Sequence, residues 1–267
     1  MKRRIFFAIL LIAAAWFAGR HFTSRHQSAA EGAGRDEIHE TFELRPGARV
    51  EVRGINGNVT VETSPGTTAE VHVVRTADSG AALADRRVSV EQTSAGLVVR
   101  GEKRGGGWWR RIFGGGGQAR EEVTLRVPRR VNLETHAVNG RVAVGEIDGS
   151  VEVGGVNGSV ELAQASVRAE VNGVNGQVSL TLDRAGERGV GMSGINGDVE
   201  FRLRESLNAD VEITGQNGGV TLNVPNVTRQ ERPDRSRMSA RLGAGGTPVR
   251  LSGVNGNVRF QSVAPAG

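Results

Sequence analysis

A short unit recurs along most of this chain: an apolar residue, asparagine and glycine, flanked on both sides by alternating apolar and polar residues. Alternation with a period of two is typical of half-buried strands and excludes helix over this region. The chain is therefore expected to be an all-β repeat array. The eight copies are centred on Ile55-Asn56-Gly57, Val138-Asn139-Gly140, Ile147-Asp148-Gly149, Val156-Asn157-Gly158, Val174-Asn175-Gly176, Ile195-Asn196-Gly197, Gln216-Asn217-Gly218 and Val254-Asn255-Gly256.

The spacing of the copies predicts how the strands pair. Asn139, Asn157 and Asn175 follow one another at a constant interval of eighteen positions, and the apolar residues around them superpose at the same interval. Asn-Gly between strands is also a strong hairpin signal, because both residues accept the positive φ of a type I′ turn. A meander of hairpins would oppose Glu146 to Val151, however, whereas parallel stacking keeps apolar residues beside apolar residues. We therefore predict a β-solenoid, in which each turn of the chain stacks on the next.

The later spacings predict the size of each rung of this solenoid. The interval grows to twenty-one positions from Asn175 to Asn196 and again from Asn196 to Asn217. A rung of roughly 18–21 residues is therefore expected. The interval from Asn217 to Asn255 exceeds one rung, so we expect the polar stretch 225–246 to leave the stack as a loop.

The N-terminal part is less regular. The stretch from Asn56 to Asn139 is long enough for roughly four rungs with an insertion. We predict one all-β domain over 39–262, a β-helix-like solenoid with loop insertions at 102–120 and 225–246, followed by a tail, 263–267. Its early strands are expected at 48–53, 58–62, 69–75, 87–92, 96–101 and 121–127.

The N-terminal segment, 1–22, has the pattern of an export signal or a membrane anchor. Three basic residues, 2–4, precede fifteen uninterrupted apolar residues, 5–19. As a helix this run would extend roughly 22 Å, short of the ~30 Å hydrocarbon core, which favours a cleaved signal peptide. The poor cleavage motifs leave an uncleaved transmembrane helix open. We expect residues 23–38 to be a polar linker and the protein to be exported, whether periplasmic, inner-membrane-anchored or at the cell surface.

Composition excludes several classes of function. The five basic residues among the first thirty equal the whole formal net charge of +5, so the body has no excess charge to attract nucleic acid. Cysteine is absent, and the five histidines do not occur in pairs at metal-ligand spacing. No nucleophile elbow or phosphate-binding loop is present either. We expect no catalytic residue, no cofactor and no metal site.

We interpret the repeated Asn-Gly pairs as structural turns. Glycine supplies positive φ, asparagine tolerates it, and stacked asparagine side chains can hydrogen-bond along a ladder. A calcium site is the alternative, but calcium requires several carboxylate oxygens, and only Asp148 and Asp198 lie at or beside a turn. The turn residues are Asn56, Gly57, Asn139, Gly140, Asn157, Gly158, Asn175, Gly176, Asn196, Gly197, Asn217, Gly218, Asn255 and Gly256.

One segment, 104–117, interrupts the strands. It places two of the three tryptophans beside arginines and between runs of glycine. Such a segment suits a membrane interface, where aromatic rings lie among headgroups and arginines meet anionic groups. The alternative is a hydrophobic finger that folds back over the solenoid. The residues predicted to contact a membrane or an envelope partner are Trp108, Trp109, Arg110, Arg111, Ile112 and Phe113.

The run 127–133, Val-Pro-Arg-Arg-Val-Asn-Leu, leads into Val138-Asn139-Gly140 and resembles the bacterial putative-adhesin domain family of β-strand repeats, a domain of unknown function. The resemblance covers about residues 40–262. It implies an envelope-located, right-handed β-helix-like body without catalytic residues, and the Trp-Trp segment departs from it. The leading hypothesis is a non-enzymatic, adhesin-like interaction or structural module. An accessory sensor of envelope stress and a polysaccharide-acting β-helix enzyme are the alternatives.

Overall fold

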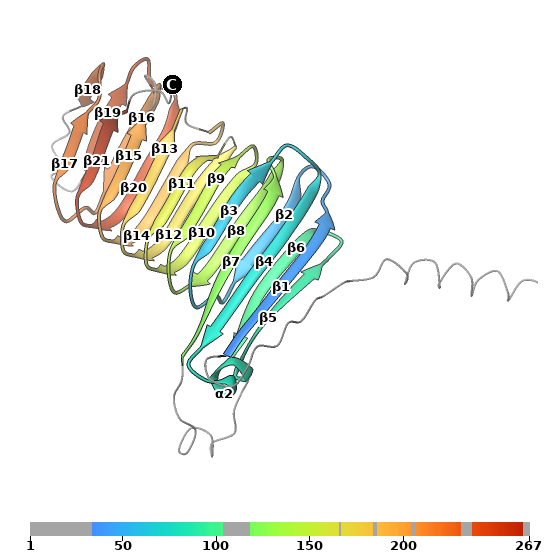
Figure 1. The fold of residues 1–267 in the computed structure, drawn as a ribbon. Helices are drawn as coiled ribbons and strands as arrows, with labels where there is room; N and C mark the ends of the chain where they lie inside the picture. The colour runs from blue at the N-terminus through green and yellow to red at the C-terminus, as the bar shows by residue number, and fades with distance from the viewer. Residues whose placement is uncertain are drawn as a thin grey trace, which may run out of the picture.

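The computed structural model describes residues 34–103, 118–165, 167–183, 186–203, 207–230 and 237–263, and these residues form an all-β protein. The predicted signal or anchor, 1–22, lies outside them. Two large sheets face each other across the core (Figure 1). Sheet A has the strand order β1-β4-β7-β3-β9-β11-β13-β15-β21-β17, and sheet B has the order β18-β19-β16-β20-β14-β12-β10-β8-β2-β6-β5.

The strands alternate between the two sheets along most of the chain. We call a strand of sheet B together with the next strand of sheet A a rung. The elements are β1 (Gly34–Glu43), β2 (Ala48–Arg53), β3 (Val59–Ser64), β4 (Thr68–Ala77), α2 (Gly80–Ala84), β5 (Arg86–Gln92), β6 (Gly96–Lys103), β7 (Ala119–Pro128), β8 (Val131–Val138), β9 (Val142–Ile147), β10 (Ser150–Asn157), β11 (Val160–Ala165), β12 (Arg168–Asn175), β13 (Val178–Leu182), β14 (Val190–Asn196), β15 (Val199–Leu203), β16 (Ala209–Thr214), β17 (Val220–Asn223), β18 (Val227–Gln230), β19 (Arg237–Leu242), β20 (Thr247–Asn255) and β21 (Val258–Ser262).

The parallel register predicted from the constant spacing of the repeats is confirmed. Val156 pairs with Val138 on one side and with Val174 on the other, and Val160 pairs with Val142 and Val178. Each apolar residue therefore stacks on its equivalent in the neighbouring rungs, and the alternate residues of both sheets fill one continuous core. The six predicted early strands are also present, as β2 to β7.

The chain does not stack in simple sequence order at its ends. The first rung, β2–β3, lies between rungs β6–β7 and β8–β9, and the last rung, β20–β21, lies between β14–β15 and β16–β17. The expectation of about four rungs between Asn56 and Asn139 is therefore wrong, because these two residues belong to adjacent rungs. Asn196 likewise stacks on Asn255 rather than on Asn217.

Antiparallel strands at both ends correct the prediction of a uniform solenoid. β1, β4 and β7 are antiparallel neighbours in sheet A, as are β5 and β6 in sheet B. At the other end, the stretch 225–246, expected to be a loop, contains β18 and β19, which extend sheet B beyond β16. The polar composition that suggested a loop reflects two strands at the end of sheet B, the edge strand β18 and its neighbour β19, whose outward residues meet solvent.

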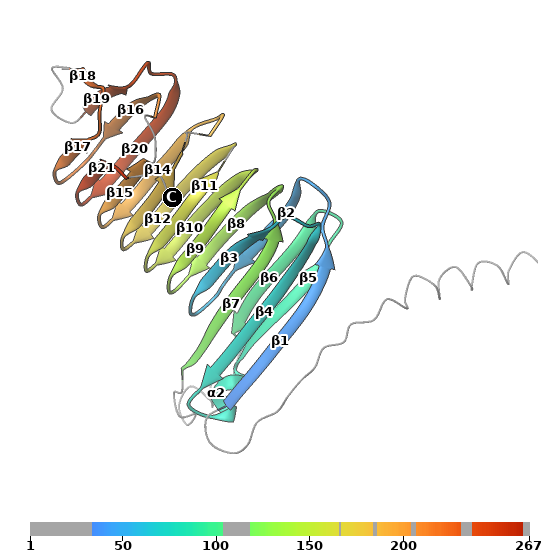
Figure 2. The same cartoon turned by 45° about the horizontal axis from the view of Figure 1, so that its top comes forward.

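The N-terminal strands project beyond the stack and carry α2 at their tip (Figures 1 and 2). Gly34 pairs with Ala77, and Ala77 pairs with Ala119, so these three residues form one row across β1, β4 and β7. Ala82 of α2 packs with Ala77 and Ala119 in a small separate apolar cluster. Residues 34 and 119, distant in sequence, thus lie at the same tip.

Candidate functional site

The predicted turn asparagines come together as a single hydrogen-bonded ladder along one corner of the stack. Every ladder asparagine after the first donates its side-chain amide N–H to the side-chain oxygen of the asparagine in the adjacent rung, at 2.8–3.2 Å. All these bonds run in one direction, so the amide dipoles reinforce one another. In spatial order the ladder contains Asn56, Asn139, Asn157, Asn175, Asn196, Asn255 and Asn217.

The glycine after each ladder asparagine is required by stacking as well as by its backbone angle. A Cβ on Gly158 would lie 2.6 Å from the carbonyl carbon of Gly140 in the neighbouring rung, at a φ of 153°. The prediction that the ladder asparagines also take positive φ is wrong. Among the described residues other than glycine, only Ala137 and Asn226 have positive φ. The turn is therefore not the type I′ hairpin that Asn-Gly commonly indicates.

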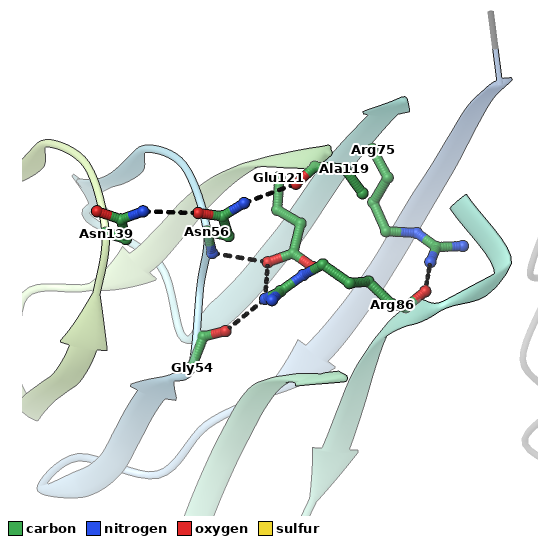
Figure 3. Close-up of polar contacts among 7 residues, drawn as sticks. All are labelled: Gly54, Asn56, Arg75, Arg86, Ala119, Glu121 and Asn139. Atoms are coloured by element: carbon green, nitrogen blue, oxygen red, sulfur yellow. Dashed lines mark hydrogen bonds and ion pairs between the residues drawn. The ribbon is translucent and has the colours of Figure 1, made fainter. Parts of the chain in front are cut away.

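A buried ion pair closes the ladder where it meets the N-terminal strands (Figure 3). The Glu121 side chain is fully buried, and its two carboxylate oxygens accept from Arg86 at 2.7 and 2.9 Å. One of them also accepts from the backbone N–H of Asn56 at 2.8 Å. Arg86 donates in addition to the carbonyl of Gly54, and the Asn56 amide donates to the carbonyl of Ala119. Both charges and the end of the ladder are thus satisfied.

This cluster joins the two sheets, because Arg86 lies on β5 of sheet B and Glu121 on β7 of sheet A. Arg75 extends the network by donating to the carbonyl of Arg86 and by pairing with Asp36 of β1. A buried charge that loses its partner typically costs about 3–5 kcal/mol, so the cluster strongly couples the sheets. Sequence reasoning missed it, since Arg86 and Glu121 are distant in sequence and carry no signal of their contact.

A row of glutamates lies on the outer face of sheet B. Glu51, Glu134, Glu152 and Glu170 occupy the same register position on four neighbouring strands. Arginines on the same face pair with three of these carboxylates, Arg49 with Glu134 and Glu51, and Arg168 with Glu170. Carboxylates in one row about 4.8 Å apart do not converge on a point. Accordingly, no cluster of metal-ligating groups occurs among the described residues.

A hollow of about 280 Å³ near the C-terminal end combines acidic and basic groups. Such a cluster is the feature that would favour a polysaccharide-cleaving enzyme. Its groups neutralise one another, however: Asp210 pairs with Arg241 at 3.0 Å, and Glu212 lies 4.0 Å from Arg250. The backbone N–H of Gly246 and the Arg241 guanidinium lower the pKa of the Asp210 carboxyl. Asp210 therefore stays ionised at neutral pH and is a poor general acid.

The predicted contact residues 108–113 lie outside the described residues. The strands that flank them end at Lys103 and begin again at Ala119, at the tip that carries α2. In the described parts of the chain, no helix is both long and apolar enough to cross a membrane.

Together the geometry defines an all-β protein of stacked rungs with an asparagine ladder at one corner. Solved bacterial structures align with this chain at low similarity. A "putative cell adhesion protein" from Clostridium sporogenes is 11% identical, with 85% of this chain and 100% of that chain covered and a TM-score of 0.40. A "putative adhesin" from Bacteroides fragilis is 12% identical, with 84% and 96% covered and a TM-score of 0.42.

A "putative lipid binding protein" from Parabacteroides distasonis is 9% identical, with 86% of this chain and 95% of that chain covered and a TM-score of 0.29. No family model matches the chain. No curated protein matches it either. Two of these structures bear an adhesin or cell-adhesion name, but the similarity is too low to transfer a family, a partner or a function to this chain.

Proposed function

We propose that the protein is a non-enzymatic module of the bacterial cell envelope, an adhesin-like interaction or structural protein built on a β-helix-like stack. The stack supports this proposal because its apolar columns are filled and its outer faces are rows of short polar and charged side chains. Such a body presents extended, rigid surfaces rather than a catalytic pocket.

One observation carries the proposed orientation of this module. The row Gly34, Ala77 and Ala119 places the start of β1 and the start of β7 at the same tip. The apolar segment 5–19 precedes β1, and the Trp-Arg segment 104–117 precedes β7. Both predicted membrane-contacting segments therefore join the body at one tip, as expected if that tip faces a membrane.

Tryptophan fluorescence tests the membrane contact. The chain has only three tryptophans, so the variant Trp16→Phe leaves Trp108 and Trp109 as the sole reporters. We expect lipids brominated on their acyl chains to quench the fluorescence of this variant in vesicles that contain anionic lipid. The matched variant Trp108→Ala/Trp109→Ala reports on Trp16 alone. If the fluorescence of Trp16→Phe is unchanged by brominated lipid, the segment does not contact the membrane.

Cell fractionation with the intact mass of the native N-terminus tests the location. A cleaved form at the cell surface supports the adhesin-like function. An uncleaved form in the inner membrane supports the second candidate, an accessory sensor of envelope stress, which the common tip also favours. A cytoplasmic, uncleaved form would contradict both.

A further inference from the structure

The two ends of the stack differ in how far each sheet extends beyond the last rung. At the C-terminal end, sheet A stops at β17, whereas sheet B continues past β16 with β19 and β18. At the N-terminal end the relation is reversed: sheet A continues past β7 with β4 and β1, and sheet B continues past β6 with β5 alone. Sheet B therefore extends farther than sheet A at the C-terminal end, and sheet A extends farther than sheet B at the N-terminal end.

β17 is an open edge with unsatisfied bonding capacity. Among the described residues it pairs with β21 alone, and Val258 donates to the carbonyl of Gly219. In a parallel ladder alternate residues face the partner strand, so the backbone groups of Val220 and Leu222 point away from β21. Unpaired backbone groups in a row are a template for an added strand.

Apolar side chains are left half-covered at the same place. Five of the seven partly buried apolar residues that pack on the main core lie at this end of the stack. They face the space that further strands of sheet A would occupy opposite β19 and β18. They are Val220, Leu222, Val224, Val227 and Met238.

Charge distinguishes β17 from the other edge strands and the two ends from each other. β1, β5 and β18 all contain charged residues, which discourage edge-to-edge pairing, but β17 contains none. β1 has four acidic residues and one arginine. At the C-terminal end, β17, β18, β19 and β21 together have four arginines and no acidic residue. Arg237 and Arg241 lie near Glu212 and Asp210 of β16, whereas Arg259 is exposed and has no ion pair among the described residues.

We propose that copies of this chain associate head to tail, with β1 of a second copy adding to β17 and continuing sheet A. The direction of the strands allows it, because two antiparallel steps make β1 parallel to β7 and so to the rest of the stack. This association goes beyond the proposed function and does not depend on a membrane.

Strand counts favour this arrangement over a tail-to-tail dimer. In a head-to-tail pair, the last rung of one copy, β16–β17, is followed by the rung β6–β7 of the next copy. Two strands of sheet A, β1 and β4, then lie between these rungs, and three strands of sheet B, β19, β18 and β5. The mismatch is one strand, about 5 Å. Two β17 edges meeting each other would leave four strands of sheet B opposite none of sheet A, a mismatch of about 19 Å. A head-to-tail contact leaves one β17 edge and one β1 edge unused at the ends of each dimer, so further copies can add.

Site-directed cross-linking tests the proposal without background, because the chain contains no cysteine. Thr41→Cys places a thiol on the exposed side of β1, and Thr221→Cys places one on β17. The full chains, purified in mild detergent, are treated with a short bis-maleimide singly and as a mixture. We expect a dimer band in the mixture and little in either single variant. Thr181→Cys, on β13 in the middle of sheet A, is the matched control and should not cross-link with Thr41→Cys.

The alternatives give different results. Cross-linking of Thr221→Cys with itself would indicate a tail-to-tail dimer and overturn the proposal. The absence of cross-linking in the mixture would also overturn it, at concentrations up to about 100 µM, where even weak association is populated. Arg259→Glu should reduce the cross-linked fraction about threefold to tenfold, since it places like charges at the contact. Arg188→Glu, an exposed charge in mid-stack, should not. Equal effects of both variants would refute the charge argument and the β1–β17 contact with it.

Discussion

Replacement of Thr135 by valine should stabilise the protein. Thr135 is fully buried on β8, and its hydroxyl oxygen has no hydrogen-bond partner among the described residues. Its neighbours in the same core column are Val52 and Val153. Valine has nearly the same shape, so it would fill the same space and remove the unsatisfied hydroxyl.

The magnitude follows from two contributions. A buried polar group without a partner costs about 1–3 kcal/mol, and a buried methyl group in its place adds up to about 0.8 kcal/mol. Allowing for partial relaxation around Thr135, we expect Thr135→Val to raise the free energy of unfolding by about 1–2 kcal/mol. For a domain of this size, this corresponds to a rise in Tm of about 3–6 °C.

Urea unfolding followed by circular dichroism and thermal melts of the full chain in detergent measure the effect. Thr76→Val, at an exposed position of β4, is the control and should change stability by no more than about 0.5 kcal/mol. Thr135→Ser keeps the hydroxyl, loses the methyl group and should destabilise. A lower stability of Thr135→Val would refute the reasoning, since it would show that the hydroxyl is satisfied.

Three further results are expected. Gly158→Ala should cost at least about 4 kcal/mol or prevent folding, because its Cβ would overlap the carbonyl group of Gly140, whereas Gly191→Ala, with open space around it, should fold normally by circular dichroism. Ala137→Gly should raise the free energy of unfolding in urea by about 0.5–1 kcal/mol, because Ala137 has a φ of 55° in a column where other rungs have glycine. The folded-state pKa of Asp210 is lowered, so its contribution to stability is present above the unfolded pKa of about 3.9 and is lost as pH falls through the folded value; Asp210→Asn should flatten the acid limb of stability below about pH 4.

The stacked centre of the fold could be predicted from sequence, because its residues repeat at a fixed interval. Asn139, Asn157 and Asn175 identify the parallel register without any other information. Hairpins and parallel stacking place different residues beside each other. Parallel stacking is favoured because it puts like residues in columns, where they pack most regularly. The direction of the ladder and the role of its glycines depend on contacts between rungs, which the turn sequence alone does not specify.

The arrangement of the ends could not be predicted for the same physical reason. Every rung presents nearly the same column of apolar residues, so the rung of Asn255 fits on that of Asn196 as well as the rung of Asn217 would. What decides the order is the long connection through β18 and β19, whose polar sequence lacks the repeat. The Arg86–Glu121 pair is a tertiary contact with no periodic signal, and the predicted contact residues 108–113 lie outside the described part of the chain.

The placement of the first and last rungs one position inside the stack determines how the molecule responds to force and to proteases. Fraying normally starts at chain termini. Here the two ends differ: β21 is held between β15 and β17, so pulling at the C-terminal end must break pairings on both of its sides, whereas β1 is an edge strand of sheet A and pairs with β4 alone among the described residues. Three of the four outermost strands, β5, β17 and β18, are internal segments of the chain, and β1 is the one that can peel away from an end of the described chain. Unfolding from the C-terminal end should therefore require a cooperative rupture of two rows of strand pairing, whereas unfolding from the N-terminal end can begin with the loss of β1 alone.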